Sequence, residues 1–393
     1  MKILFVMNKN FSHRSTSEHL LCAILERLAE QGHDILILQM LAPGAEAVIP
    51  ESLRRYDVKT EAITITPQKK TNFIGRYLHA ARNFRAYSKI LKRQTDRKHV
   101  FIQSSNVAGV AVATIRRFIK DAVITCNVQD IMPYNLVCSG KLKKNSLVFR
   151  LLAAVQRYGY RHADRIITIS EDMKDTLIAD GTPEEKIEVV YNWSYRDEPY
   201  EGLDLKPVSH MFDSTCFNVV YAGNIGVMQN VELMIEAARL TREDNKLWFH
   251  IIGDGVYKDK LVDKAKACGV ANISFWPMQP SELAPLIYSA ADVNVIPLVK
   301  GGYRTALPSK TATCLACQKP IIFAIGRDSA FAQKAEREAG CTVVEADRPE
   351  ELADAIRKIR SEGQNSDMAA FFKENCSITK NSRRYAEIIT KGE

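Results

Sequence analysis

The sequence has few of the features that would place it outside the soluble globular class. No window of 18 apolar residues occurs, so no transmembrane helix is expected. The opening stretch MKILFVMNKN has a basic start, but its apolar run is only five residues long. That pattern predicts a first strand rather than a signal peptide. Repeats and low-complexity tracts are absent as well, which disfavours solenoid, fibrous and disordered architectures.

Cysteines are present, but not in a pattern that suggests a disulfide framework. Nine are scattered along the chain, and only Cys314 and Cys317 stand close together. Their CxxC spacing has no second cysteine pair or histidine pair beside it. Buried small residues on a packed helix are therefore favoured over a zinc or redox site. The pattern indicates a reducing compartment and hence a cytoplasmic protein.

The chain contains enough apolar material for two domains. It has 393 residues, of which 46% are apolar and 25% charged, and one core seldom serves so long a chain. Strand and helix patterns alternate in two series, as in parallel sheets wound on both faces. We predict an α/β protein with two Rossmann-like doubly wound domains facing across a cleft. The expected segments are a first domain over 1–195, a linker over 196–215, a second domain over 216–370, and a C-terminal helix over 371–393 that crosses back to the first domain.

The net charge of +8 is concentrated in two amphipathic stretches. Residues 68–99 hold ten Lys or Arg and one acid, with apolar residues from Phe73 to Leu91 at helical spacing, and residues 141–165 repeat the pattern. One interpretation is a helix that lies on anionic lipid with its aromatic face in the headgroups. The alternative is a core helix with a solvated basic face. Nucleic acid is disfavoured as a partner because no DNA- or RNA-binding motif accompanies the charge.

Three turns in the second half follow strands and suit an anion. Two of them, in YAGNIGVMQN and IIGDGVYKDKL, contain glycines that permit close backbone approach. Those glycines are Gly223, Gly226, Gly253 and Gly255. In the third, GGYRTALPSK, Ser309 is a good helix N-cap, and Lys310 and Arg304 add positive charge. Their convergence predicts a phosphate or pyrophosphate site.

These motifs give the chain a resemblance to a known family. Between residues 219 and 322, the motifs VVYAGNIGVMQN, FHIIGDGVYKDKL, ISFWPMQPSELAPLIYSAADVNVIPL and LPSKTATCLACQKPII occur in this order. They resemble the nucleotide-binding domain of retaining glycosyltransferases of the GT-B fold, close to family 4. The last motif is similar to a variant in transferases of capsule and O-antigen aminosugars. In the first half, VQDIMPYNLV, RIITISEDMKDTL and VVYNWSY resemble that subfamily's acceptor-side loop, Ser-Glu turn and Asn-Trp junction.

The chain departs from the family pattern at the donor site. Thr305 and Thr313 stand where many members carry two glutamates. Ribose recognition is therefore expected from a hydroxyl, from backbone, or not at all. The Arg and Lys pair that clamps the diphosphate in the family maps near Asn224 and near Gln229 or Asn230.

Lys310 and Arg304 are the cations left to neutralise the phosphates. The glycine-rich loop that usually follows the first strand is also missing, and Ser15, Thr16 and Ser17 stand there at the start of a helix.

The resemblance implies roles for individual residues. Lys310, with Arg304 and the turn from Gly223 to Gly226, would stabilise the departing diphosphate. Asp130 would orient the acceptor hydroxyl, and Gln129 falls where relatives often carry a histidine. A purely structural carboxylate is the alternative for Asp130. The other predicted contacts to the nucleotide sugar are Asn224, Asp254, Thr305, Pro308, Ser309 and Thr313. The predicted acceptor-side residues are Ser15, Thr16 and Asn192.

The expected function is transfer of a sugar, an N-acetylated aminosugar, from a UDP-sugar to a lipid-linked or oligosaccharide acceptor in bacterial surface polysaccharide synthesis. The protein is expected at the cytoplasmic face of the membrane. No metal cofactor is expected, because no Asp-x-Asp follows a strand. A catalytically weak GT-B protein that serves as partner or scaffold of a transferase is the main alternative. A non-hydrolysing epimerase of the same fold is disfavoured, since it would need carboxylates and histidines around the nucleotide.

Overall fold

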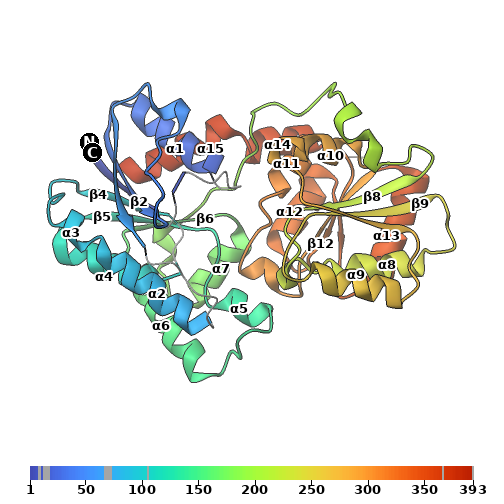
Figure 1. Cartoon of the computed structure of the whole chain (residues 1–393), viewed down its shortest axis with the longest axis horizontal. Coiled ribbons are helices and arrows are strands. Elements are labelled where there is room, and N and C mark those ends of the chain that lie inside the picture. The colour runs from blue at the N-terminus through green and yellow to red at the C-terminus, as the bar shows by residue number, and fades with distance from the viewer. Residues whose placement is uncertain (8–9, 12–17, 66–72, 104–105, 365–366, 392–393) are drawn as a thin grey trace. The chain divides into compact units, whose positions relative to one another are not determined.

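The computed structural model of the chain describes residues 1–7, 10–11, 18–65, 73–103, 106–364 and 367–391. The chain divides into two compact units (Figure 1). The first comprises Met1–Val137, Leu142–Tyr191 and Thr379–Glu393, and the second comprises Cys138–Lys141 and Asn192–Ile378. Each unit is built on its own parallel sheet with helices on both faces, so the predicted doubly wound α/β class is confirmed.

The first unit contains a seven-stranded parallel sheet in the order β3-β2-β1-β4-β5-β6-β7. The strands are β1 (Lys2–Val6), β2 (Asp34–Leu41), β3 (Val58–Thr64), β4 (His99–Ile102), β5 (Val123–Val128), β6 (Arg165–Thr168) and β7 (Ile187–Val189). The helices are α1 (Glu18–Glu30), α2 (Phe73–Ala86), α3 (Ser88–Leu91), α4 (Ala108–Phe118), α5 (Tyr134–Cys138), α6 (Leu147–His162), α7 (Glu171–Ala179) and α15 (Ile378–Thr390).

The direction of the crossovers decides which face each helix covers. From β1 the chain moves through α1 to β2 on one side, and from β4 it moves through α4 to β5 on the other. Because parallel crossovers are right-handed, α1 and α4 must lie on opposite faces. The β5 to β6 crossover runs in the same direction as the β4 to β5 crossover, so α6 joins α4. Figure 1 shows α2, α4 and α6 together on one face.

The last helix, α15, returns the chain to the first unit. Tyr385, Ile388 and Ile389 on α15 are almost completely buried. The Arg165 guanidinium at the start of β6 donates hydrogen bonds to the carbonyls of Ile388 and Ile389, at 2.7 and 3.0 Å. The Tyr385 ring meets the Phe101 ring edge-on at 6.4 Å between centroids. The helix is thus part of the core of the first unit.

The second unit contains a six-stranded parallel sheet in the order β10-β9-β8-β11-β12-β13. The strands are β8 (Phe217–Ala222), β9 (Leu247–Ile252), β10 (Ile273–Trp276), β11 (Val293–Pro297), β12 (Ile321–Ala324) and β13 (Thr342–Val344). The helices are α8 (Glu232–Leu240), α9 (Lys258–Ala267), α10 (Ala284–Ala290), α11 (Thr311–Ala316), α12 (Ala330–Ala339), α13 (Pro349–Glu362) and α14 (Met368–Asn375).

The apolar face of the first basic stretch lies largely in the core. Phe84, Tyr87, Ile90 and Leu91 are each no more than 6% exposed. The lipid-facing interpretation is therefore wrong for these four side chains, because they are buried within their own unit. Leu78 on α2 is different, with 64% of its surface exposed.

Membrane spans, metal ligands and disulfides were expected to be missing, and three features of the described residues concern them. No helix within the described ranges is long and apolar enough to cross a membrane. The same residues contain no group of three or more His, Cys, Asp or Glu side chains that could hold a metal ion. All nine cysteines are free thiols, and Cys314 and Cys317 are buried.

Candidate functional site

The second sheet has a topological switch point between β8 and β11. From β8 the chain goes through α8 to β9, and from β11 it goes through α11 to β12 on the opposite side. In open parallel sheets, ligands bind outside the carboxyl ends of the strands at this point, where the two connections diverge. The segments that leave β8, β9 and β11 carry the predicted donor-site residues.

The turns after β8 and β9 contact each other through their backbones. The Gly223 N–H donates to the Ile252 carbonyl at 2.8 Å, and the Ile225 N–H donates to the Asp254 carbonyl at 2.7 Å. A Cβ on Gly253, whose φ is +151°, would lie 1.9 Å from the Gly223 oxygen. A Cβ on Gly255 would lie 2.3 Å from the Ile225 oxygen. The glycines of the GDG turn are therefore required for turn packing.

The polar residues at the family's clamp positions hold the β8 turn in shape. The Gln229 side-chain oxygen accepts hydrogen bonds from the Gly226 N–H and the Asn224 amide, both at 3.1 Å. The Asn230 amide donates to the carbonyls of Leu298 and Ala346, at 3.3 and 2.7 Å. These amides have a structural use, which explains how the turn keeps its form without the charged pair.

Lys310 places a buried amine beside this turn. Its Nζ lies 3.4 Å from the centroid of the Tyr221 ring on β8 and has no hydrogen-bond partner. A Cβ on Gly223 would lie 2.9 Å from that nitrogen. Part of the Lys310 side chain is exposed, but the amine itself is buried. Burial lowers the pKa of Lys310 from 10.5 to about 7, because a charge without a partner is poorly solvated there. An anion at this turn would supply the missing partner.

The helix after Lys310 begins later than the sequence predicts. Ser309 is exposed and does not cap the helix, because α11 starts at Thr311 with Lys310 as its N-cap and no side-chain cap bond. The Thr311 N–H donates to the Pro308 carbonyl at 3.0 Å, which forms a turn before the helix. The predicted capping role of Ser309 is wrong. With only six residues in α11, the helix contributes little dipole, and Lys310 is the main positive group at this position.

Arg304 and the two threonines have other contacts. The Arg304 Nε donates to the Tyr303 hydroxyl at 2.9 Å, and its guanidinium pairs with Asp328 at 3.2 Å. These bonds raise the pKa of Arg304. The buried Thr305 hydroxyl donates to the Gly302 carbonyl at 3.0 Å, and Thr313 is buried within α11. No contact described for Arg304 involves Lys310 or the β8 turn.

The remaining donor-side predictions are Asp254 and Pro308. Asp254 is exposed, and its carboxylate accepts the Gly255 N–H at 2.8 Å. Pro308 is half-buried beside the Thr311 turn. The structure thus brings together Gly223, Gly253 and Lys310, whereas Arg304 is directed toward Asp328.

In the first unit, Gln129 belongs to a polar network that the sequence did not indicate. Its amide donates to Asn127 Oδ1 at 3.0 Å, and that oxygen also accepts the Tyr385 hydroxyl at 3.2 Å. The Asn127 amide donates to Gln103 Oε1 at 3.0 Å. Gln103 follows β4, and its N–H bonds to the Val6 carbonyl of β1, so the network lies at the switch point of the first sheet.

The other residues predicted for the acceptor side lie in different parts of the chain. Asp130 is exposed just after the end of β5, and Asn192 is buried at the start of the Asn192–Ile378 segment of the second unit. Ser15 and Thr16 lie outside the described residues. The spacing of Asn127 in β5 and Gln129 just after it, two residues apart, was an available signal for the network. Tyr385 had none, because it lies 258 residues away from Asn127.

Comparison with known families finds a match over both halves of the chain. A model described as Glycosyltransferase Family 4 matches residues 17–193, and one described as Glycosyl transferases group 1 matches residues 216–362. The Pseudomonas aeruginosa protein WbjE, whose name gives it as a probable glycosyltransferase, is 28% identical over 199 residues. The Escherichia coli K12 protein WcaI, named for a glycosyl transferase role in colanic acid biosynthesis, is 30% identical over 220 residues.

These curated relatives are matched over part of their length only. The aligned region covers 50% of this chain and 49% of WbjE, and 55% of this chain and 54% of WcaI. The chain thus spans about half the length of the curated relatives it matches.

Solved structures agree with the fold over the whole chain. Anabaena Alr3699/HepE in complex with UDP and glucose has a TM-score of 0.73 at 14% identity, with 100% of both chains covered. WaaG, a glycosyltransferase of lipopolysaccharide biosynthesis, has a TM-score of 0.68 at 15% identity, with 99% of this chain and 100% of that chain covered. At this level of identity the likeness establishes the fold alone.

Proposed function

We propose that this chain, which belongs to the family 4 and group 1 glycosyltransferases of GT-B fold, moves a sugar from a nucleoside diphosphate to an acceptor hydroxyl with retention. One observation supports the donor half of this reaction most strongly. The buried Lys310 amine lies beside the β8 turn at the switch point and has no partner. A diphosphate oxygen is the type of group that would complete its hydrogen bonding.

In the proposed reaction the bond between the anomeric carbon and the diphosphate oxygen breaks, and the acceptor oxygen bonds to that carbon from the same face. The acceptor proton passes to the departing phosphate oxygen. Protonated Lys310 stabilises the negative charge that develops there, an effect of about 3–4 kcal/mol for a well-placed donor. Because Lys310 supplies positive charge, we propose that the reaction needs no metal ion.

Asp130 and Gln129 are the proposed acceptor-side residues. The exposed carboxylate of Asp130 can accept a hydrogen bond from an acceptor hydroxyl and orient it. The network from Gln103 to Tyr385 fixes the side chain of Gln129 through Asn127. Because the Gln129 amide donates to both Asn127 and Tyr385, Gln129 is proposed as a neutral positioning residue on the acceptor side.

The proposed donor is a UDP-sugar carrying an N-acetylated aminosugar, and the proposed acceptor is a lipid-linked glycan at an anionic, cytoplasmic membrane face. UDP is supported by the Anabaena structures, which hold UDP, UDP-glucose, or UDP and glucose. The aminosugar is supported by the PSK motif alone. The name of WcaI, which refers to colanic acid biosynthesis, favours a surface polysaccharide as product.

A second candidate is a scaffold protein that has lost transfer activity. It is favoured by Thr305, whose buried hydroxyl already donates to the Gly302 carbonyl and is not available to a ribose. This candidate predicts a folded partner of a transferase with weak nucleotide binding or none.

Calorimetric titration of the full chain with UDP, GDP and ADP separates these candidates. We expect UDP to bind and the other two to bind at least tenfold more weakly. Release of UDP from UDP-sugars in the presence of lipid-linked acceptor would then demonstrate transfer, and EDTA should leave the rate unchanged. Absence of binding by any nucleotide at millimolar concentration would favour the scaffold, and loss of the rate in EDTA would contradict the metal-free proposal.

A further inference from the structure

Four helices on one face of the first sheet form a surface without acidic residues. Helices α2, α3, α4 and α6 contain nine Lys or Arg and no Asp or Glu. Helix α4 contacts α2, α3 and α6. We call the solvent side of these four helices the basic helix face. Its charge distribution is unlike that of the chain as a whole, in which 46 acids partly balance 54 cations.

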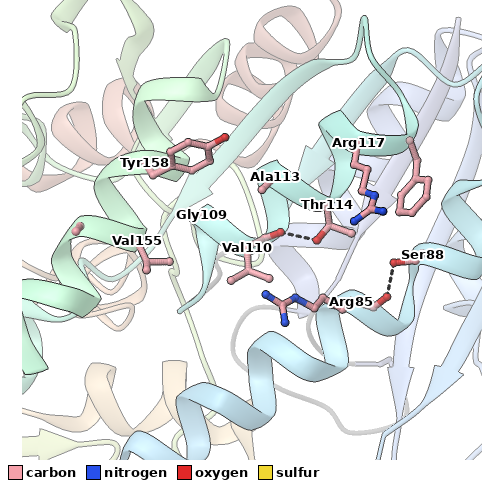
Figure 2. A pocket seen from close by; sticks show the side chains of 11 residues that line it. Arg85, Ser88, Gly109, Val110, Ala113, Thr114, Arg117, Val155 and Tyr158 are labelled. Atoms are coloured by element: carbon pink, nitrogen blue, oxygen red, sulfur yellow. Dashed lines mark hydrogen bonds between the residues drawn. The ribbon is translucent and has the colours of Figure 1, made fainter.

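A groove crosses the basic helix face. Helices α4 and α6 approach so closely that a Cβ on Gly109 would lie 2.0 Å from the Val155 oxygen, and one on Gly159 would lie 2.5 Å from the Ala108 carbonyl carbon. The groove has a volume of about 530 Å³ and is open to solvent. Figure 2 shows Gly109, Val110 and Ala113 of α4 between Tyr158 on one side and Arg85 on the other.

Two arginines line this groove without a counterion. Arg85 lies in the last turn of α2, and Arg117 lies in the last turn of α4. Neither forms an ion pair with any of the described residues, although Arg117 lies 5.8 Å from the Phe118 ring. Arg116 and Arg157, on α4 and α6, pair instead with Asp164 and Asp180. Arg85 and Arg117 thus place two unpaired guanidinium groups at the groove, where they fit an anion.

Exposed apolar side chains lie beside the groove. Leu147, Leu151 and Leu78 are 81%, 64% and 64% exposed, and Tyr158 is 45% exposed. Leu151 precedes Tyr158 by seven residues, and Leu78 precedes Arg85 by seven, so each leucine lies on the groove side of its helix. Leu147 is one turn before Leu151. Seven large apolar side chains are exposed among the described residues, and four of these seven lie on the basic helix face.

We propose that the basic helix face docks on an anionic phospholipid bilayer, with a lipid phosphate in the groove between Arg85 and Arg117 and with the leucines in the apolar layer. Cations near a membrane surface are attracted to anionic lipid, and apolar side chains that enter the headgroup boundary are desolvated. Leucines interspersed with arginines fit a bilayer better than a nucleic acid, which would use aromatic stacking or base contacts. The inference rests on the proposed function only in placing the acceptor in a membrane.

The test measures sedimentation of the full chain with vesicles, without any transferase assay. Vesicles of phosphatidylcholine alone are compared with vesicles containing phosphatidylglycerol, at low and high salt. The wild type should bind the phosphatidylglycerol vesicles at least tenfold more strongly, and high salt should weaken this binding. Equal binding to both vesicle types, or to neither, would overturn the proposal.

The diagnostic variant is Arg85→Glu with Arg117→Glu, and its matched control is Lys266→Glu with Arg337→Glu. All four residues are exposed cations in the last turns of helices, so net charge and helix-end effects change equally. The groove variant should lose binding at least tenfold, while the control keeps it. Equal losses in the two variants would mean that net charge alone attracts the chain.

A second variant tests the apolar contribution. Leu147→Ser with Leu151→Ser should abolish the binding that survives high salt and leave circular dichroism unchanged, because both side chains are exposed. Full retention of that binding would contradict insertion. Capture of the wild type by an acidic protein or by RNA, with no binding to vesicles, would assign the face to another partner. Nucleotide titration of each variant separates these outcomes from failure of the proposed function, since UDP binding should not change.

Discussion

At the scale of single residues, Lys310 affects the stability of the unliganded protein as well as the binding of a nucleotide. A buried amine with no hydrogen-bond partner destabilises the fold, because it loses water and gains no protein partner. Natural proteins retain such groups where function uses them. We therefore expect Lys310 to raise nucleotide affinity and to lower the stability of the unliganded protein. A substitution should change both quantities, in opposite directions.

Replacing Lys310 with methionine keeps the length of the side chain and removes its charge. We expect the free energy of unfolding without ligand to rise by about 1–3 kcal/mol, the cost of an unsatisfied buried polar group. UDP affinity should fall by roughly ten- to a hundredfold, the equivalent of one charge-assisted hydrogen bond. Urea denaturation and calorimetry measure the two effects. Lys266→Met, on an exposed helix end, is the control and should change neither; a destabilised Lys310→Met would contradict the argument.

The pH dependence of stability follows from the lowered pKa. Between about pH 7 and pH 10.5 the unfolded chain holds a proton on Lys310 that the folded chain does not. The free energy of unfolding should therefore rise with pH across this window in the wild type relative to Lys310→Met, and stay level below pH 7. Denaturation of both proteins at pH 6.5, 8 and 9.5 tests this, since other groups cancel in the difference. A difference that is independent of pH would mean that the amine is solvated.

At the scale of elements, the crossing of α4 and α6 determines the shape of the basic helix face. In an open helix, Gly109→Ala would stabilise by about 1 kcal/mol. Here the added carbon would meet the Val155 carbonyl, so we expect a loss of about 1–3 kcal/mol, typical of overpacking. Thermal unfolding measures it. Ala113→Gly, at an exposed position of α4, gives the ordinary cost in helix propensity for comparison. A stabilised Gly109→Ala would show that the two helices can move apart at little cost in free energy.

The elements differ in how far local sequence could predict them. The parallel strands were predictable because buried strands are continuous apolar runs. The start of α11 was not, because Ser309 is a good cap by local chemistry, while the contact of Lys310 with Tyr221 belongs to the tertiary fold. The burial of Phe84 and Tyr87 was left open for the same reason: a helical repeat of apolar residues is identical whether sheet or lipid covers it.

At the scale of the site, the sequence predicted which turns converge but not what their residues do. Gly223 of the β8 turn meets Lys310 as expected, since β8 and β11, the strands that precede them, are neighbours in the sheet. Arg304 was predicted beside the phosphates, yet Asp328 pairs with it. That partner is 24 residues further along the chain, and no local pattern indicates the pair.

At the scale of the whole molecule, the first unit depends on the last helix. Removing residues 379–393 would delete the buried side chains of Tyr385, Ile388 and Ile389. Each such loss costs about 2–5 kcal/mol, and together they rival the total stability of about 5–15 kcal/mol typical of a domain. We expect the truncated chain to be cut rapidly within residues 1–191 by protease, while 192–378 stays resistant. Arg384→Ala, on the exposed side of the same helix, should leave the digestion pattern unchanged, whereas protection of both units in the truncated chain would contradict this dependence.

The return of α15 also sets the order in which a ribosome can complete the two units. Synthesis passes Tyr191 and must continue through Asn192–Ile378 before α15 exists, which at typical elongation rates takes roughly 10–40 s. During that interval Phe101 and Asn127 lack the tyrosine that covers them in the finished protein. The second unit has all of its strands and can fold at once. The half of the protein that is translated first is therefore the half that finishes folding last, and until α15 emerges its uncovered sheet is a substrate for chaperones.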